Sequence, residues 1–403
     1  MKNNGNIPEI VITNLSNHIS YIQWFVYGLM LLSRENKIRL KFRLSLIQRM
    51  LLTNNMMLLW RAINKIKRMF DGSAEVKAKA LYMRGYVKIK GEKRTFCIDY
   101  ADSPNMFSGK LLETVDCYFK LQCPKNIIEE GFKLGDIYLP YFDSEFENPL
   151  DNGKIKGKRK LCPQVYKYRD KIKPLMVAVR SMGNSCSFKE LDAFYRNLLK
   201  SRDIEKSKTA MCYFGFAYGP VPSEHVVYPD YDWESDIMGY FGNQLHHPNE
   251  KRNKIADILS SMGDKYDARV ICSGNSDGES GSQRTDLIIP LKDFSAFVAQ
   301  FQYNINVSGY RMSIPARFID SFICGTAIAT DNLEVKWYHP FGKEVFEFGE
   351  MGYLRDENVN YSTIREKLAS LPQINKSEII DIYEKYWSPK AVANYLVETT
   401  TNS

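Results

Sequence analysis

The stretch from Tyr303 to Asp331 contains the residues best placed to bind a phosphate. Its apolar residues up to Val307 predict a strand, the polar residues that follow predict a loop, and Pro315 suits the first turn of a helix. Backbone N–H groups at a helix N-terminus attract anions through hydrogen bonds and the helix dipole. A phosphate or diphosphate is therefore the expected ligand. The loop residues that we expect around it are Gly309, Tyr310, Arg311 and Ser313.

The predicted helix after this loop carries a basic and an acidic residue on one face. Arg317 and Asp320 are three residues apart, and the apolar residues around them are expected to face the core. Asp320 is suited to accept hydrogen bonds from ribose hydroxyls, as an acidic residue does in dinucleotide-binding folds. The alternative is a surface ion pair between Arg317 and Asp320, with Gly309 serving only a tight turn.

Candidates for a general base lie in the first part of the chain. His18 is in a polar loop after the first predicted strand, at the sheet edge where α/β proteins bind ligands, and the usual pKa of histidine is near neutrality. Asp99 and Asp102 are in the loop expected after a later strand and are the second choice. The alternatives are structural roles: helix capping beside His18 and turn formation at 102–104.

The elements that must position these residues alternate between strand and helix, which predicts an α/β fold. A strand at 9–13, a helix at 21–34 and a strand at 37–42 form a βαβ unit, so we expect a parallel sheet. Strands and helices alternate again from 236 to 330, which predicts a doubly wound sheet.

We therefore predict two Rossmann-like domains that face each other across a cleft. Residues 1–230 are expected to form an N-terminal acceptor-binding domain and residues 231–375 a C-terminal nucleotide-sugar-binding domain. Residues 376–403 are expected to form a helix, which could cross back to the N-terminal domain. Ligands of open α/β sheets bind outside the carboxyl ends of the strands. The function should therefore lie in the cleft.

The order of a strand, a glycine-containing polar loop, a helix with an acid and then the sequence GTAIATD resembles the donor-binding stretch of GT-B glycosyltransferases. The portion from Arg311 to Asp331 looks most like the exostosin-like and the capsule or lipopolysaccharide transferase groups. The resemblance covers about 235–335 and implies that Asp320 contacts the ribose of the donor and Arg311 its diphosphate. It also places Lys251 or Arg252, at a basic helix start, near that diphosphate; the alternative is a solvated first helical turn.

The resemblance implies a transferase that moves a sugar from a UDP- or GDP-linked donor to a glycan or lipid-linked acceptor in surface polysaccharide synthesis. It implies no catalytic metal and no cofactor besides the donor. Met312 stands where many retaining enzymes have the first of two glutamates, so retention or inversion stays open. A sugar-nucleotide epimerase of the same fold and a basic nucleic-acid-binding protein are the alternative functions.

The charge of the chain is concentrated in one segment. There are 55 basic and 47 acidic residues, net +8, and residues 41–70 hold seven basic residues and no acid. The nearly neutral remainder argues against nucleic acid as a partner, because nucleic-acid-binding proteins spread cations along many phosphates. Between Met56 and Phe70, apolar and basic residues separate at helical spacing, which favours contact with an anionic membrane surface. The alternative is a helix that packs on the sheet.

Other features exclude several classes of protein. The sequence contains no G-x-S-x-G, P-loop, G-x-G-x-x-G or H-E-x-x-H motif, and its eight cysteines form no C-x-x-C pair. The longest apolar run, Ile19 to Leu32, is shorter than a bilayer span and contains Gln23. We therefore expect a cytoplasmic protein with reduced cysteines, peripheral on the inner face of the membrane if residues 41–70 bind lipid.

Overall fold

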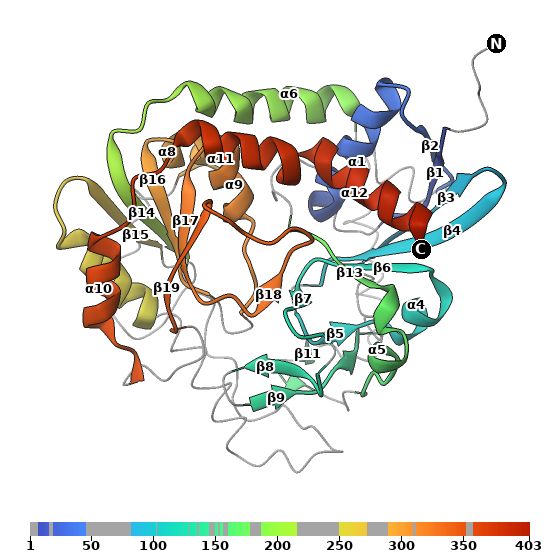
Figure 1. Cartoon of the computed structure of the whole chain (residues 1–403), viewed down its shortest axis with the longest axis horizontal. Coiled ribbons are helices and arrows are strands. Elements are labelled where there is room, and N and C mark those ends of the chain that lie inside the picture. The colour runs from blue at the N-terminus through green and yellow to red at the C-terminus, as the bar shows by residue number, and fades with distance from the viewer. Residues whose placement is uncertain are drawn as a thin grey trace.

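A computed structural model shows a mixed α/β protein with two large sheets, four two-stranded sheets among the described residues and a helical layer that spans both large sheets (Figure 1). The structure describes residues 7–15, 19–45, 82–101, 103–127, 129–134, 137–144, 150–151, 154–155, 160–177, 187–215, 250–271, 289–308, 312–351 and 358–403. Of the predicted site residues, His18, Asp102, Gly309, Tyr310 and Arg311 lie outside this set, as do residues 46–70 of the basic segment. The α/β class predicted from the sequence is confirmed.

The N-terminal sheet has six strands in the order β13-β6-β4-β3-β1-β2. The strands are β1 (Glu9–Asn14), β2 (Arg39–Phe42), β3 (Tyr82–Ile89), β4 (Glu92–Asp99), β6 (Cys117–Lys120) and β13 (Ile172–Pro174). β1 and β2 are parallel and are joined through helix α1 (Ile19–Arg34), as the βαβ pattern predicted. The sheet as a whole is mixed, however, because β3 is antiparallel to both β1 and β4.

The turn between β3 and β4 explains why the prediction of a parallel sheet was wrong. Lys90 and Gly91 both have positive φ, 50° and 91°, which is the backbone of a two-residue hairpin turn. A hairpin this short can only join antiparallel strands. Glycine tolerates this conformation without the steric penalty of a side chain.

The C-terminal sheet has five parallel strands in the order β15-β14-β16-β17-β19. The strands are β14 (Lys208–Gly215), β15 (Tyr266–Ile271), β16 (Phe301–Asn306), β17 (Ala327–Asp331) and β19 (Val345–Gly349). When the strands are numbered by their order along the chain, they lie in the sheet in the order 2-1-3-4-5, which is a doubly wound topology. The strand order reverses between β14 and β16. The sheet already begins at Lys208, upstream of the boundary near 230 expected from the sequence.

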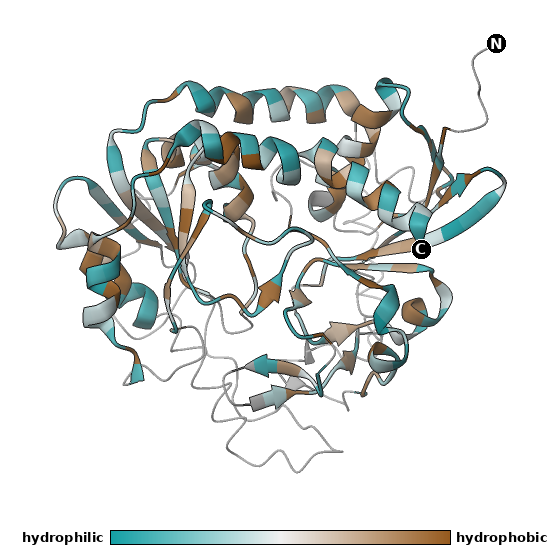
Figure 2. Ribbon diagram, viewed as in Figure 1, coloured by the Kyte–Doolittle hydropathy of each residue, from teal (hydrophilic) through white to brown (hydrophobic). Residues whose placement is uncertain are grey.

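Helices pack against the C-terminal sheet and supply its crossovers. Helix α8 (Leu291–Val298) leads into β16, and α9 (Arg317–Ile323), which joins β16 to β17, packs on α8. The helical residues 250–260 lead into β15, and α10 (Tyr361–Ala369) packs on β19. Figure 2 shows hydrophobic residues concentrated in the strands and α9, whereas α6 (Phe188–Leu199) presents many hydrophilic residues on the outside.

The C-terminal helices connect the two sheets. Helix α11 (Lys376–Ile382) continues through a π-helical turn, Tyr383–Trp387, into α12 (Pro389–Asn402). α12 packs on α1 and on β3 and β4 of the N-terminal sheet. Gly28 of α1 permits this contact, because a Cβ atom there would lie 2.0 Å from the carbonyl oxygen of Pro389.

Two further observations concern the helices and the cysteines. Within the described part of the chain, no helix is both long enough and apolar enough to span a bilayer. The described cysteines are buried free thiols: Cys97, Cys117, Cys123, Cys162, Cys212 and Cys324.

Candidate functional site

Two arginines converge on the end of β14, next to the point where the strand order of the C-terminal sheet reverses. The guanidinium carbons of Arg252 and Arg317 lie 6.0 and 5.9 Å from the centre of the Phe214 ring. Arg317 also donates from Nη1 to the carbonyl oxygen of Tyr213 at 3.2 Å. Arg252 comes from the helical residues 250–260 and Arg317 from α9, so two elements far apart in sequence supply the pair.

The two arginines differ in burial. Arg252 is only 9% exposed, and burial lowers the pKa of its guanidinium while the charge of Asp331 opposes this. Arg317 is partly exposed. Arginine remains protonated at neutral pH in either setting, so both residues contribute positive charge at this edge of the sheet.

Asp331, the last residue of β17, is the centre of a buried polar network. Its Oδ1 accepts from the backbone N–H of Ser308 at 3.0 Å, from Ser308 Oγ at 2.9 Å and from Thr330 Oγ1 at 3.1 Å. Asn306 Nδ2 donates to Thr330 Oγ1 at 2.9 Å. The network ties the carboxyl end of β16 to the carboxyl end of β17, one strand away from the arginine pair.

Burial perturbs the two carboxyl groups of this region. It raises the pKa of Asp331 to about 6, against the hydrogen bonds from Ser308 and Thr330 and the charge of Lys251. It raises the pKa of Asp320 to about 7, although part of the Asp320 surface remains accessible, and the charge of Arg317 opposes the rise. Strongly perturbed carboxyl groups are common at functional sites.

Lys251 is held at the carboxyl edge of the same sheet. It is 1% exposed, and its Nζ donates to the carbonyl oxygen of Met351, just after β19, at 2.6 Å. The alternative of a solvated first helical turn is therefore wrong for both Lys251 and Arg252. The structure brings Arg252 and Arg317 together around Phe214 and places Lys251 on the Asp331 side of the site.

The connection between β16 and α9 differs from the prediction in one respect. The helix begins at Arg317 with Ala316 as its N-cap, so Pro315 precedes the helix and is not in its first turn. Ser313 is partly exposed, and the fully buried Met312 has a φ of 52°, a strained backbone for a residue with a side chain. The helix ends as predicted at Gly325, where Thr326 N donates to Ser321 O and Gly325 N to Phe322 O.

The N-terminal sheet reaches this connection through the segment that follows β6. Gln122 Nε2 donates to the carbonyl oxygen of Ile314 at 2.9 Å, and Gln122 Oε1 accepts from Ile314 N at 3.0 Å. The next residues, β7 (Cys123–Pro124), pair antiparallel with β18 (Val335–Lys336). The carboxyl end of β6 is thus joined to the β16–α9 connection of the other sheet.

Asp99, a predicted base, occupies a different position from the one expected. It is the last residue of β4 and is completely buried, with Oδ2 accepting from Lys120 Nζ at 2.9 Å and from Tyr118 OH at 2.6 Å. Oδ1 accepts from Ala101 N at 2.9 Å. Both oxygens are therefore engaged, and the prediction of a loop residue facing an acceptor is wrong for Asp99.

Several residues of this region were not assigned from the sequence. Asn306, Ser308 and Asp331 lie in the stretch already singled out, and the polar ending of the apolar run in β17 was a usable signal for Asp331. Gln122 carries no such signal, because its partner Ile314 is 192 residues away. Across the described ranges, no cluster of three or more His, Cys, Asp or Glu residues has metal-binding geometry.

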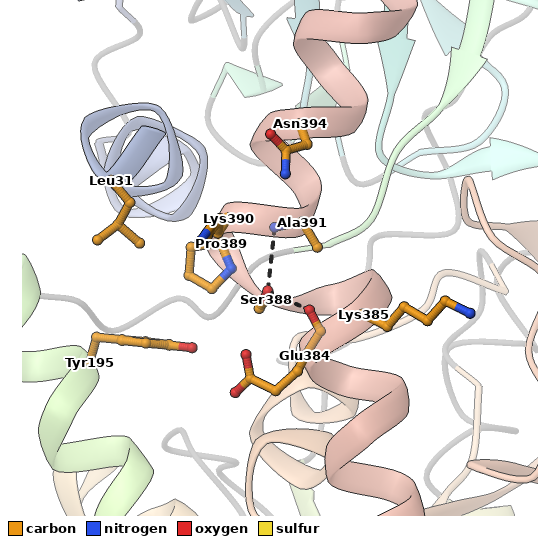
Figure 3. A pocket seen from close by; sticks show the side chains of 9 residues that line it. All are labelled: Leu31, Tyr195, Glu384, Lys385, Ser388, Pro389, Lys390, Ala391 and Asn394. Carbon is orange, nitrogen blue, oxygen red and sulfur yellow. Dashed lines mark hydrogen bonds between the residues drawn. The ribbon is translucent and has the colours of Figure 1, made fainter. Parts of the chain in front are cut away.

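A cavity of about 370 Å³ lies elsewhere, where α1, α6 and the start of α12 meet (Figure 3). Two of its charged residues form ion pairs, Glu384 with Arg202 and Lys390 with Glu35, each at 2.6 Å, and Lys385 Nζ lies 4.9 Å from the centre of the Tyr386 ring. Ser388 at its centre caps α12 and accepts from Ala391 N. These contacts assign the lining residues to helix packing.

Comparisons with known proteins give distant similarity to solved structures alone. No family model and no curated protein matches the chain. Among solved structures, a chain in the crystal structure of a GtfA/B complex aligns at 9% sequence identity with a TM-score of 0.30. The alignment covers 71% of this chain and 53% of the other, so this chain spans about half the length of the solved one.

Proposed function

We propose that this chain transfers a sugar from a nucleotide-diphosphate donor, and that the C-terminal sheet binds the donor. The observation that carries the proposal is the placement of Arg252 and Arg317 around Phe214, beside the reversal of strand order. Open α/β sheets bind nucleotides in the crevice at this position. Guanidinium groups pair with phosphate oxygens through two parallel hydrogen bonds, so two arginines suit a diphosphate.

The chemistry follows from the charge of the leaving group. As the bond between sugar and diphosphate breaks, negative charge builds up on the diphosphate, and fixed cations stabilise it. Burial holds Arg252 and the hydrogen bond to Tyr213 O holds Arg317, which reduces the reorganisation needed during the reaction. Arg311, in the adjacent connection, remains a proposed third contact to the diphosphate, and Lys251 a proposed source of long-range positive charge.

In this proposal the acceptor binds between the two sheets, as in the GT-B arrangement. The Gln122–Ile314 contact supports this, because it joins the segment after β6 to the connection that leads into α9, the helix of Arg317. His18 and Asp102 remain the proposed bases for the acceptor hydroxyl. Asp99 is not among them, since it forms a fully buried salt bridge with Lys120.

The acceptor is proposed to be a glycan or a lipid-linked glycan at an anionic membrane surface. Residues 41–70 are the proposed contact, and exposed Arg39 on β2 adds a positive charge just before this segment. A surface of this charge is attracted by anionic headgroups at about 1 kcal/mol per cation near the membrane.

Nucleotide binding tests the proposal directly. UDP or GDP should raise the melting temperature of the parent, because a ligand at a hundred times its Kd adds about 2.7 kcal/mol of stability. Arg252→Ala and Arg317→Ala should each reduce this shift, whereas Arg196→Ala, on exposed α6, should not. Failure of every nucleoside diphosphate to shift the parent would refute the proposal.

An epimerase acting on the same donor is the second candidate, since it needs the same diphosphate site. The contact between Gln122 and Ile314 brings the segment after β6 of the N-terminal sheet to the site. A second sheet beside the donor favours a reaction with an acceptor. Product analysis with a sugar nucleotide as sole substrate separates the two: an epimerised nucleotide sugar would identify the epimerase.

A further inference from the structure

The N-terminal sheet has one face on which α12 packs and an opposite face. α12 contacts β3 and β4, and its Tyr395 lies against Phe119 of β6 with ring centres 5.9 Å apart. In the strand register Phe119 lies beside Ile98 of β4, which lies beside Met83 of β3. Side chains alternate along a strand, so Arg84, which follows Met83, points away from α12. We call the side of β2, β1, β3 and β4 to which Arg84 belongs the outer face.

Exposed cations follow the outer face across these four strands. Arg39 of β2 lies beside Glu9 of β1, and Glu9 lies beside Lys88 of β3. Lys88 is directly opposite Lys93 of β4. Figure 2 shows hydrophilic residues toward the turn of the hairpin that β3 and β4 form. The exposed cations of the outer face are Arg39, Lys41, Arg84, Lys88 and Lys93.

Glu9 is the one acidic residue that the described part of these strands places among the cations. It accepts a hydrogen bond from Lys41. This bond and, further, the charges of Lys88 and Arg43 lower the pKa of Glu9. One carboxylate therefore serves several cations, while Lys88 faces Lys93 with no acid between them. Like charges directly opposite each other in an antiparallel pair are destabilising, so the outer face keeps its positive charge at a cost to stability.

The chain that follows β2 supplies no counter-charge in its first part. Residues 41–70 hold seven basic residues and no acid, so this segment and the outer face have the same sign of charge. Four strands spaced by about 4.8 Å make the outer face about 14 Å wide. A surface of this width contacts several anions at once, which suits an extended anionic partner better than a single small anion.

The chemistry of the outer face favours a membrane over a nucleic acid. Single-stranded nucleic acids are bound largely through bases that stack on exposed aromatic rings. Tyr86 supplies a ring among these cations, but it is only partly exposed and Lys93 Nζ lies over it, 4.4 Å from its centre. Headgroups of anionic lipids need no stacking surface, and each Lys or Arg near them adds to the attraction.

We infer that the outer face of the N-terminal sheet docks on the anionic headgroups of a membrane. The inference rests on the proposed function, which places the acceptor at a membrane, and it deepens that function by naming a surface built from described strands. Contact through exposed Lys and Arg side chains is electrostatic, so the docking is reversed by salt. α12, on the opposite face of the sheet, then points away from the membrane.

Co-sedimentation of the full chain with vesicles tests the inference. The parent should bind vesicles of phosphatidylserine and phosphatidylcholine at low salt, and it should bind vesicles of phosphatidylcholine alone much less. The outer-face variant carries Arg84→Gln, Lys88→Gln and Lys93→Gln. Its affinity for the anionic vesicles should be lower by about a hundredfold, the effect of three cations near the surface. If this variant does not fold, Lys88→Gln alone should weaken binding by about fivefold.

The matched control removes the same number of charges from exposed positions outside the N-terminal sheet. It carries Lys189→Gln, Lys200→Gln and Lys265→Gln and should bind the anionic vesicles as the parent does. Parental binding by the outer-face variant would overturn the inference, as would an equal loss in both triple variants or no binding of anionic vesicles by the parent. Tighter binding of the parent to polyuridylic acid than to the vesicles, lost in the outer-face variant, would overturn it in favour of nucleic acid.

The shift of melting temperature by UDP or GDP separates this inference from the proposed function. The outer-face variant should keep the parental shift, because its substitutions lie outside the C-terminal sheet. Parental vesicle binding together with a retained shift would overturn the docking surface and leave the donor site intact. No shift in the parent would refute the donor site, whatever the vesicles show.

Discussion

The side chain of Gln122 forms two hydrogen bonds with the backbone of Ile314, as a neighbouring strand would. Both residues are buried, at 2% and 1% exposure, and they lie in connections that follow β6 of one sheet and β16 of the other. Ile314 precedes Pro315, which has no N–H, and follows the strained Met312. The amide of Gln122 thus satisfies the backbone where the connection to α9 offers few other partners.

Gln122→Ala should therefore lower the free energy of unfolding substantially. It would leave a buried N–H and a buried carbonyl oxygen unsatisfied, each costing about 1–3 kcal/mol. Denaturant titration followed by tryptophan fluorescence measures the change. Gln164→Ala is the control, because Gln164 bonds to Glu113 in an exposed setting. An equal effect of the two substitutions would contradict the role assigned to Gln122.

Gly28→Ala should destabilise the chain, although alanine normally stabilises a helix relative to glycine by about 0.5–1 kcal/mol. The added Cβ would lie 2.0 Å from Pro389 O and 2.9 Å from Ala393 Cβ, so α12 would have to move. Overpacking of this kind costs about 1–3 kcal/mol. Thermal unfolding shows whether Gly28→Ala raises or lowers the melting temperature, and Ser33→Ala, on the same helix, is the control. A more stable Gly28→Ala variant would mean that α12 does not pack on α1 as described.

The sequence predicted the parts of the fold that depend on local pattern. The βαβ unit at the N-terminus, the strand that ends at Asn306 and the Gly325 helix end all follow from periodicity and turn residues. The antiparallel β3 was missed because the Lys90–Gly91 turn was not used to infer strand direction. Relationships between distant segments, such as Arg252 with Phe214, have no local pattern.

The raised pKa of Asp320 predicts that the free energy of unfolding depends on pH. Burial raises its pKa to about 7 in the folded protein, above the value of about 3.9 in an unfolded chain. The folded state then binds more protons than the unfolded state between about pH 4 and pH 7, so stability falls as pH rises through this window. Asp331, raised to about 6, acts in the same direction.

Asp320→Asn should remove most of this dependence. Its free energy of unfolding should exceed that of the parent at pH 7.5 by about 1–3 kcal/mol, allowing for partial solvent screening, and the two should converge near pH 4. Urea unfolding at both pH values measures this. The control is Asp170→Asn, an exposed carboxylate, for which no such difference is expected. The opposite result is that the free energy of unfolding of the parent, measured relative to Asp320→Asn, is higher at pH 7.5 than at pH 5. It would show that the folded protein stabilises the ionised carboxylate instead.

Turnover is predicted to persist in EDTA. The proposed donor site stabilises the diphosphate with arginine side chains, and the resemblance to GT-B enzymes implies no catalytic metal. Transfer from a radiolabelled sugar nucleotide to an added glycan or lipid-linked glycan acceptor, with and without EDTA, is the measurement. Loss of activity on chelation and its return with Mn²⁺ would contradict both the mechanism and the GT-B assignment.

Residues 41–70 are predicted to bring the chain to anionic membranes. Arg61, Lys65 and Arg68 gather on one side of the predicted amphipathic helix, and exposed Arg39 and Arg43 add positive charge near the start of the segment in the sequence. Changing Arg61, Lys65 and Arg68 to Glu should abolish co-sedimentation with vesicles of phosphatidylserine and phosphatidylcholine, because about 1 kcal/mol is lost for each cation and repulsion is added. The matched control changes the exposed Lys189, Lys200 and Lys265 to Glu, which alters the net charge by the same amount outside residues 41–70. If both triple variants lose binding equally, net charge alone drives association, and if the parent does not bind these vesicles at low salt, the helix packs on the protein instead.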